Sequence, residues 1–403
     1  MRLEHLPEEF IKASAVIDEI ERHGFEAYFV GGSVRDTLLG KKSHDVDIAT
    51  SAYPEEIKQI FKRTVDVGID HGTVLVLYEE DQYEITTFRT ESTYQDYRRP
   101  DTVTFVRSLE EDLKRRDFTI NALALEKNGT IIDLFDGLAD LKNGVIRAVG
   151  DPKERFHEDA LRMMRGLRFA SQLDFDIEKE TMGAIYQFHS LLSKISVERI
   201  TIEFVKLLLG ENRQKGLLPF IETECYQSCP GLKEKTMALL RFSELPNKMI
   251  EEERMVWAML LRELAIPITE SRDFLKLWKL SNHLIHDVTE LSYGLGQRLE
   301  ADWQPKDLFR MGLEKVLIVE KMLFFYGQEV KLEEAEKLFS GLPITDRKQL
   351  KVTGNDLLAE IDQKPGKWLG RLIDQLEEAV INGVLVNEKQ ALIAYAKEFV
   401  KKE

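Results

Sequence analysis

The residue pattern changes sharply near Asp151, and this change limits the folds open to the chain more than any other feature. Before it, short apolar runs bounded by turn residues alternate with short helical patterns, and residues 72–88 and 121–135 are each typical of a β-hairpin. After it, nearly every segment has apolar residues at helical spacing, as in residues 195–210 and 367–383. The sequence therefore predicts an α/β head on a mixed or mostly antiparallel sheet, followed by an all-helical remainder.

Length and charge restrict the class of protein. The chain has 403 residues, too many for one compact core, and predicts about two to four domains. Its 71 acidic and 56 basic residues give a net charge of -15, so a polyanionic partner has to meet a local basic surface. The two cysteines, Cys225 and Cys229, have no nearby Cys or His to complete a zinc site, which favours reduced thiols. Without a long apolar run or a signal-peptide pattern in residues 1–10, we expect a cytoplasmic protein without membrane contact.

Two aspartates separated by one residue begin the strand predicted over residues 45–50. On a strand, Asp45 and Asp47 project from one face, while Val46 and Ile48 point into the core. Two carboxylates this close repel each other and raise each other's proton affinity unless a cation or an arginine lies between them. The pair is therefore either a solvated strand end or a site for a hard cation.

The residues before this pair favour a cation site. Gly31 and Gly32 let the backbone approach a ligand closely, and the short helix after them has N-terminal amides suited to a phosphate. Arg35 adds a planar guanidinium for phosphate oxygens. Anion-binding groups beside two carboxylates predict Mg²⁺ and a nucleoside triphosphate, a pairing used for nucleotidyl transfer.

Further motifs follow these two in a fixed order along the chain. They are "GGSVRD" (31–36), "DVD" (45–47), "RRDFTINALA" (115–124), "DLFDGLADL" (133–141), "EDALR" (158–162) and "ERITIE" (198–203). In this order and spacing the chain resembles the nucleotidyltransferase superfamily that includes DNA polymerase beta. Within it, the chain is similar to the branch shared by bacterial poly(A) polymerases and the CCA-adding tRNA nucleotidyltransferases of the eubacterial and eukaryotic class. Residues 352–358 and 376–388 resemble the body and tail of the shorter CCA-adding enzymes.

The resemblance implies an architecture and an activity. The expected parts are a catalytic nucleotidyltransferase head, a helical neck for base selection, a helical body and an elongated tRNA-binding tail, at residues 1–150, 151–210, 211–300 and 301–403. The expected reaction adds C, C and A to the 3′ end of tRNA from CTP and ATP, without a nucleic-acid template and with release of pyrophosphate. The implied partners are tRNA, CTP and ATP, with a homodimer left open. In this scheme Asp45 and Asp47 hold catalytic Mg²⁺, and Gly32 and Arg35 cradle the triphosphate.

The "RRD" segment resembles a ribose-reading motif. By this resemblance, Asp117 accepts a hydrogen bond from the ribose 2′-hydroxyl and Arg116 contacts a phosphate or the sugar. This arrangement favours ribonucleotides over deoxyribonucleotides. The alternative is surface ion pairing between these residues and Arg115, which contributes little to stability.

The helical pattern after residue 154 offers a mechanism for base selection. On one continuous helix, Asp159 and Arg162 share a face and present an acceptor and a donor pair to one base edge. Cytosine, through N4 and N3, and adenine, through N6 and N1, both match this pair. Guanine and uracil reverse the pattern and leave buried polar groups unpaired, at a cost of about 1–3 kcal/mol each. The pair therefore predicts acceptance of C and A and rejection of G and U.

Two more arginines follow on the same predicted helix. Arg165 continues the side of Asp159 and can stack under the base or contact phosphate. Arg168 lies about 180° from Asp159 around an ideal helix, but the family pattern includes an arginine there, so we retain it as a nucleotide-binding residue. The alternative for the whole segment is a ladder of i,i+3 salt bridges.

Three other predictions concern supporting residues. Glu84 lies on a strand that can run beside the two aspartates, and is either a third carboxylate of the site or an exposed strand residue. Arg199 and Glu203 are expected to form an i,i+4 pair that stiffens the neck. The segment "YQDYRRPD" (94–101) resembles the family's flexible loop, although Tyr97 replaces its usual small residue. Its charged residues, Asp96, Arg98 and Arg99, favour an enzyme able to switch from C to A addition.

Other functions remain open on the sequence alone. A poly(A) polymerase, or a nucleotidyltransferase restricted to CC or to A addition, would share the same head. An inactive tRNA-binding protein would keep the fold, but the intact carboxylates argue against it. His283, His286 and Asp287 superficially match a metal phosphohydrolase, yet the required upstream histidine is missing, and core or surface histidines are expected.

Overall fold

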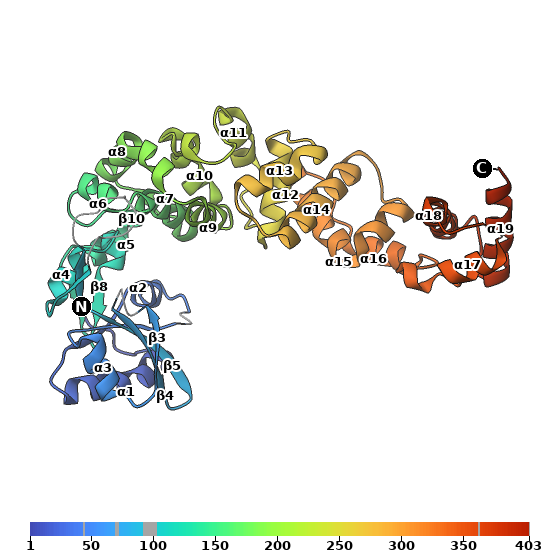
Figure 1. The fold of residues 1–403 in the computed structure, drawn as a ribbon. Helices are drawn as coiled ribbons and strands as arrows, with labels where there is room; N and C mark the ends of the chain where they lie inside the picture. Colours follow the sequence, from blue (N-terminus) through green and yellow to red (C-terminus); the bar gives the residue numbers. More distant parts are fainter. Residues whose placement is uncertain (43–44, 69–71, 92–102, 362, 403) are drawn as a thin grey trace. The chain divides into compact units, whose positions relative to one another are not determined.

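A computed structural model describes residues 1–42, 45–68, 72–91, 103–361 and 363–402. The chain forms two compact units, both seen in Figure 1. The first contains Met1–Met249 and Leu277–Lys279, and the second contains Ile250–Lys276 and Leu280–Glu403. The division of the chain into four parts, made from the sequence, stays a prediction.

A seven-stranded sheet organises the N-terminal part of the first unit. Its strands follow the order β3-β4-β5-β2-β1-β8-β9. The pair β2–β5 is parallel and the other described neighbours in this sheet are antiparallel, which confirms the predicted mixed sheet. The strands are β1 (Ala27–Val30), β2 (Asp47–Thr50), β3 (Thr64–Gly68), β4 (Thr73–Tyr78), β5 (Asp81–Thr87), β8 (Leu123–Leu125) and β9 (Ile131–Asp133).

Two short strand pairs accompany this sheet. The pair β6 (Arg89–Glu91) and β7 (Val103–Phe105) is antiparallel, and β10 (Val145–Ile146) runs parallel to β11 (Asp176–Ile177). The sequence predicted no strand after Asp151, and this was wrong because the short strand β11 follows it. β11 has only two residues, too few to produce a recognisable alternation in the sequence.

Both predicted hairpins are present, as β4–β5 and β8–β9.

Helices fill the remainder of the first unit. The helices are α1 (Glu8–Arg22), α2 (Gly32–Leu38), α3 (Pro54–Ile60), α4 (Leu109–Lys114), α5 (Gly137–Asn143), α6 (Pro152–Glu158), α7 (Leu161–Leu173), α8 (Lys179–Phe188), α9 (Val197–Leu208), α10 (Arg213–Glu222) and α11 (Thr236–Glu244). Short 3₁₀ turns are η2 (Thr119–Asn121), η3 (His189–Lys194) and η4 (Cys225–Ser228).

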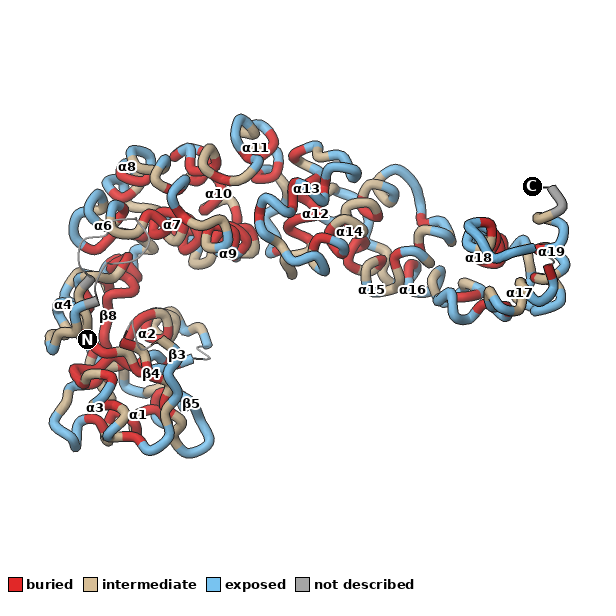
Figure 2. Tube along the Cα trace, in the orientation of Figure 1, coloured by how far each residue is buried: buried red, intermediate tan, exposed pale blue. Residues whose placement is uncertain are grey.

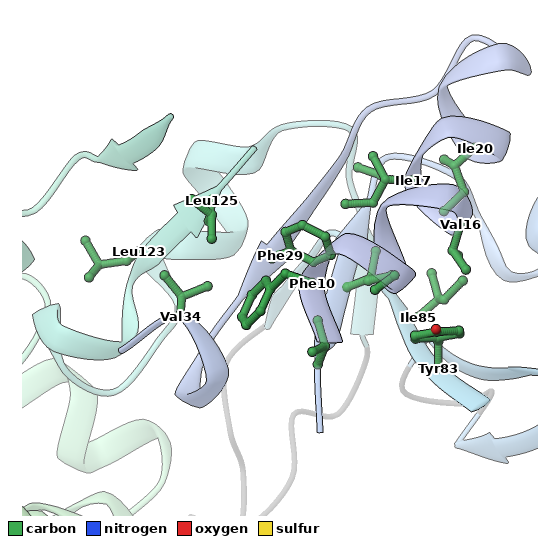
Figure 3. Packing of buried hydrophobic residues seen from close by; sticks show 14 of the residues in the cluster. Phe10, Val16, Ile17, Ile20, Phe29, Val34, Tyr83, Ile85, Leu123 and Leu125 are labelled. Carbon is green, nitrogen blue, oxygen red and sulfur yellow. The ribbon is translucent and has the colours of Figure 1, made fainter. Parts of the chain in front are cut away.

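The larger core of the head lies on the face of the sheet covered by α1. Figure 3 shows Phe10 of α1 beside Phe29 of β1, with ring centroids 4.9 Å apart in an edge-on arrangement. Val46 and Ile48 belong to the same cluster, as their predicted inward orientation requires. The opposite face has a smaller cluster that includes Leu113 of α4. The sheet is thus anchored on both faces, which fixes the position of the β2 strand end that carries Asp45 and Asp47.

Helix α7 is buried along most of its length, as Figure 2 shows in red. It packs against α9 and α10 within the first unit. At Gly216 of α10, a Cβ atom would lie 2.5 Å from the carbonyl oxygen of Leu167, so the two helices approach too closely for a larger residue. Each fully buried side chain such as Leu167 stabilises the fold by about 1.5–3 kcal/mol. This packing makes α7 a rigid support for its polar side chains.

The second unit is helical. Its helices are α12 (Glu253–Glu263), α13 (Ile268–Leu277), α14 (Asn282–Glu300), α15 (Pro305–Leu323), α16 (Leu332–Ser340), α17 (Gly354–Glu360), α18 (Lys367–Ile381) and α19 (Lys389–Lys402), with 3₁₀ turns η5 (Phe324–Tyr326) and η6 (Arg347–Gln349). The buried Glu320 accepts hydrogen bonds from Arg298 and Trp303, both at 2.8 Å, and so joins α14, α15 and the segment between them. Within the described part of the chain, no helix is both long and apolar enough to cross a membrane.

Candidate active site

A cavity of about 540 Å³ lies between the head sheet and helix α7. Its lining is strongly basic although the chain as a whole is acidic. Among the residues that the structure describes, eight arginines and three aspartates contribute to it: Arg35, Arg89, Arg115, Arg116, Arg162, Arg165, Arg168, Arg199, Asp47, Asp117 and Asp159. The cavity therefore provides the local basic surface that an acidic protein needs to bind a polyanion.

The glycine turn forms one wall of this cavity. Gly31 has φ of 75°, a backbone conformation that residues with a side chain rarely adopt. A Cβ atom on Gly31 would lie 3.3 Å from Nη1 of Arg116 and 3.6 Å from Oδ2 of Asp47. The turn thus brings the backbone close to both side chains. Gly32 begins α2, which carries Arg35 into the same cavity.

The two aspartates lie at the N-terminal end of β2. Asp47 is the first residue of the strand and Asp45 precedes it, so the strand starts later than the sequence predicted. Both side chains are exposed while Val46 and Ile48 are buried, which confirms the predicted alternation. The register Ile48↔Ile85 confirms that Glu84, on β5, runs beside this pair.

The pKa of Asp47 reflects both desolvation and nearby negative charge. Desolvation, and next the charge of Glu84, raise the pKa of Asp47 above its ordinary value; Asp45 adds to this rise and Arg116 opposes it. A second cavity, of about 430 Å³, shares Asp47 with the first and is also lined by Asp45 and Glu84. Among the described residues, however, no three carboxylate, His or Cys side chains stand close enough together to form a ready-made metal site.

Asp117 is buried at the centre of the arginine cluster. Its Oδ2 accepts a hydrogen bond of 2.7 Å from Nε of Arg165, and its Oδ1 accepts one of 3.0 Å from Nδ2 of Asn121. Desolvation alone would raise the pKa of Asp117, but the charge of Arg165 and the hydrogen bond from Asn121 outweigh it and hold the pKa well below its usual range. The neighbouring Arg116 contacts Asp112 at 3.1 Å. The residues of this motif are therefore internal components of the cavity, and the surface-pair alternative was wrong.

Asp159 and Arg162 both line the cavity, but the predicted reason was wrong. They do not share one continuous helix, because α6 ends at Glu158 and α7 begins at Leu161. Asp159 lies in the break, with φ of -138° and ψ of 103°. On one ideal helix Arg168 would lie about 180° from Asp159, but the break means that this angle does not apply. Arg168 lines the same cavity together with Arg165.

Each member of this pair is held by a different neighbour. Oδ2 of Asp159 accepts a hydrogen bond of 2.6 Å from Nη2 of Arg199. Arg162 donates from Nη1 to Glu158 at 2.7 Å and from Nη2 to the carbonyl oxygen of Arg115 at 2.9 Å. Both side chains are therefore oriented by protein contacts that leave them facing the cavity.

The predicted pair between Arg199 and Glu203 is absent from the described contacts and was wrong. Arg199 reaches Asp159, while Glu203 forms an ion pair of 2.8 Å with Arg168 and lies 4.0 Å from Arg165. The i,i+4 spacing allows a local pair, but the facing helix α7 offers several charged partners at short range. Glu203 thus pairs with Arg168 and places a negative charge near Arg165 as well.

Sequence reasoning missed several residues of the site, among them Arg89, which also lines the cavity. Buried Asp112 fixes Arg115 and Arg116, and its i,i+3 and i,i+4 spacing to them could have revealed it. Asn121 accepts from Arg35 at 2.7 Å while donating to Asp117, and Phe169 lines the cavity. No pattern distinguished these last two from ordinary core residues.

Some sequence predictions lie elsewhere. The loop 94–101, with Asp96, Tyr97, Arg98 and Arg99, falls outside the described residues. His283 lies 3.4 Å from Asp287, which also contacts Lys315 at 3.0 Å. The His283 side chain is exposed and Asp287 is buried against Lys315, in agreement with the expected structural role.

Comparisons with known proteins give the site a family. Three family models match: the poly A polymerase head domain over residues 27–147, the probable RNA and SrmB-binding site of polymerase A over 174–235, and the putative domain 2 of tRNA nucleotidyltransferase over 248–396. The chain is 63% identical over 398 residues to the CCA-adding enzyme of Enterococcus faecalis, covering 99% of this chain and 98% of that protein. It is 50% identical to that of Ligilactobacillus salivarius over the full length of both.

A solved structure agrees with these matches. The crystal structure of the Bacillus stearothermophilus CCA-adding enzyme in complex with CTP has a TM-score of 0.92 and 40% identity to this chain, covering 98% of this chain and 99% of that one. The mixed sheet, the carboxylates and the basic cavity define a nucleotidyltransferase with a poly A polymerase head. Within that class, the chain belongs to the family of CCA-adding enzymes. Nucleotidyltransferases of this kind generally use a divalent metal ion.

Proposed function

We propose that this enzyme adds C, C and A to the 3′ end of tRNA from CTP and ATP, without a nucleic-acid template and with release of pyrophosphate. The observation that carries the proposal is the arginine-lined cavity, which contains Asp47 at one end and the pair Asp159 and Arg162 at another. In this reaction the 3′-hydroxyl of tRNA attacks the α-phosphate of the bound nucleotide, and pyrophosphate leaves. The family relationship supports tRNA, CTP and ATP as the substrates.

The triphosphate is assigned to the glycine turn and its neighbours. Gly32 and Arg35 border the cavity, and Arg116 lies against Gly31, so guanidinium and backbone donors converge there. Within the described residues, Nε of Arg116 is buried without a hydrogen-bond acceptor. Because an unsatisfied buried donor is costly, a nearby anionic group is the natural complement to this arginine.

Asp45 and Asp47 are the residues that would hold Mg²⁺. Carboxylate oxygens are its preferred protein ligands, and the pKa of Asp47 is raised by desolvation and next by the charge of Glu84, effects that a bound dication would oppose. Bound there, such a cation supplies Lewis-acid stabilisation of the phosphate oxygens. Asp47 borders both cavities, so the nucleotide and the tRNA hydroxyl can approach it from different sides. Glu84, on the neighbouring strand β5, is proposed to add negative charge beside this pair, without completing a preformed three-carboxylate site among the described residues.

Asp117 is proposed to read the ribose. Its two oxygens already accept from Arg165 and Asn121, and this fixes the orientation of the carboxylate in the cavity wall. A carboxylate held this way accepts a further hydrogen bond from a 2′-hydroxyl without reorganising. The low pKa keeps it ionised, and therefore an acceptor, at neutral pH.

Base selection is assigned to Asp159 and Arg162. A fixed carboxylate and a fixed guanidinium match the amine and ring nitrogen of cytosine and adenine, and mismatch guanine and uracil. Arg199 and Glu158 supply the orientation that a continuous helix does not. Arg165 and Arg168 complete the nucleotide-binding wall.

The wider organisation follows from this assignment. We retain a head, neck, body and tail at residues 1–150, 151–210, 211–300 and 301–403, with the tail binding tRNA. The matched poly A polymerase head model, at 27–147, supports the proposed head, whereas the other two models, at 174–235 and 248–396, cross the proposed neck–body and body–tail boundaries. We propose a cytoplasmic location, and a homodimer as a further proposal.

The decisive experiment sequences the product formed from a tRNA that ends at its discriminator base. The expected product ends in CCA when CTP and ATP are supplied, with negligible incorporation of GTP or UTP given singly. Long A tails on unrelated RNA would instead identify a poly(A) polymerase. In the same assay, Asp159→Ala should admit G or U, whereas Asp273→Ala, an exposed control on α13, should not. Unchanged selectivity in Asp159→Ala would assign base recognition elsewhere.

A further inference from the structure

One buried aromatic ring contacts three arginines of the nucleotide cavity. The guanidinium carbons of Arg168, Arg35 and Arg165 lie 4.2, 5.0 and 5.4 Å from the ring centroid of Phe169. These separations are within the range of a cation–π interaction. The ring itself is 4% exposed and borders the cavity, so these contacts are largely shielded from water.

The three arginines come from two elements and carry like charges. Arg35 is on α2 of the head, whereas Arg165 and Arg168 are on α7. Each also has a polar partner, Asn121, Asp117 and Glu203 respectively. Burial is the main reason that the pKa of Arg168 is lowered to about 10; Glu203 opposes this effect, and the charges of Arg165 and Arg35 add to it.

The ring gives these charges a common neighbour that has no charge of its own. The negative electrostatic face of an aromatic ring attracts a guanidinium without competing for the N–H donors that a ligand needs. A leucine of similar volume would fill the space but would not attract the arginines. Phe118 packs edge-on against Phe169, with centroids 5.9 Å apart and an interplanar angle of 85°, and holds the ring in place.

We propose that Phe169 is a positioning residue for the incoming nucleotide, because its ring holds Arg35, Arg165 and Arg168 in one wall of the cavity. The inference rests on the proposed function, since it assigns these arginines to nucleotide binding. Phe169 acts through the arginines and does not itself contact the reacting atoms. Weakening the ring's electrostatic face should therefore weaken CTP binding while the fold and tRNA binding persist.

The test replaces Phe169 with mono-, di- and trifluorinated phenylalanine in the full chain. Fluorine withdraws electron density from the ring face and changes the side-chain volume little, so a space-filling role would not respond to it. The matched control places the same series at Phe10, which is also fully buried and edge-on to another ring, that of Phe29. The readouts are the Kd for CTP by calorimetry, the Kd for tRNA and Tm.

We expect the Kd for CTP to rise stepwise with each fluorine at position 169, by about tenfold over the series. The Phe10 series should leave it unchanged, as should Kd for tRNA in both series. Phe169→Leu should raise the Kd for CTP at least as much. A flat Kd across the Phe169 series, or an equal rise in the Phe10 series, would overturn the proposal. Failure of the unsubstituted enzyme to bind CTP would instead refute the proposed function.

Discussion

Nη2 of Arg199 donates a hydrogen bond of 2.6 Å to Oδ2 of Asp159, although the two residues are 40 positions apart. Arg199 is on α9, and Asp159 lies in the break between α6 and α7. The residue assigned to base recognition is therefore oriented from a different helix. Its geometry depends on how α9 packs against α7, which the buried contacts between these helices maintain.

Replacing Arg199 with methionine should release Asp159 while retaining most of the side-chain volume. Because misplacement of a substrate-contacting group by about 1 Å can cost about 100-fold, kcat/KM for CTP and ATP should fall by roughly 10- to 100-fold. Steady-state kinetics at saturating tRNA measure the effect. The control is Arg310→Met, which removes a comparable arginine hydrogen-bonded to Glu290 in the second unit. Wild-type kcat/KM in Arg199→Met would show that Asp159 needs no such support.

Asp47→Asn should abolish turnover and raise the Tm of the metal-free enzyme. The pKa of Asp47 is raised in the folded state, so its ionisation disfavours folding as the pH rises from the ordinary value of 3.8 through the raised pKa. The amide removes this penalty, and the Tm difference between variant and wild type should grow over that pH interval. Added Mg²⁺ should stabilise the wild type more than the variant. A lower metal-free Tm for the variant would contradict this account.

Asp117→Asn should destabilise the fold and weaken the preference for ribonucleotides. Removing one charge from the buried contact with Arg165 should cost about 3–5 kcal/mol in unfolding free energy, measured by urea titration. The folded-state pKa of Asp117 is depressed, so its favourable contribution is present above 3.8 and is lost as the pH falls further. The difference between wild type and variant should therefore shrink at acidic pH. Unchanged discrimination between CTP and dCTP would remove Asp117 from ribose recognition.

Gly31→Ala should reduce activity more than its backbone strain explains. The new methyl group would meet Arg116 and Asp47, in addition to a strain of about 1–2 kcal/mol from the positive φ. Gly24→Ala is the matched control, because Gly24 has φ of 87° and nothing within 4 Å of the added carbon. Both variants should lose similar stability in urea titrations, but only Gly31→Ala should lose about tenfold or more in kcat/KM for CTP. Equal kinetic losses would mean that strain alone is responsible.

The head was predictable because its signals are local. Alternation over residues 45–50 placed Val46 and Ile48 in the core, and turn residues marked both hairpins. These features depend on periods of two residues and on short turns, which a sequence displays directly.

The break before α7 could not be predicted in the same way. The segment "EDALR" contains no glycine or proline, and its residues differ in helix propensity by less than about 1 kcal/mol each. Tertiary contacts, including that of Asp159 with Arg199, override so small a preference. The same reason explains the failed Arg199–Glu203 pair, because sequence spacing reveals neighbours on one helix but not the charges on a facing one.

The residues that line the cavity are spread along the sequence from Gly31 to Arg199. Because a chain is synthesised from its N-terminus, the cavity can be complete only after all of these residues have been made. At translation rates of about 5–20 residues per second, the last arginine emerges roughly 10 to 40 seconds after the chain begins. A nascent or prematurely terminated chain that stops before α9 contains both aspartates but lacks the residue that orients Asp159. Such fragments would contain the two aspartates without the complete cavity lining, so we expect them to transfer nucleotides much more slowly than the full chain.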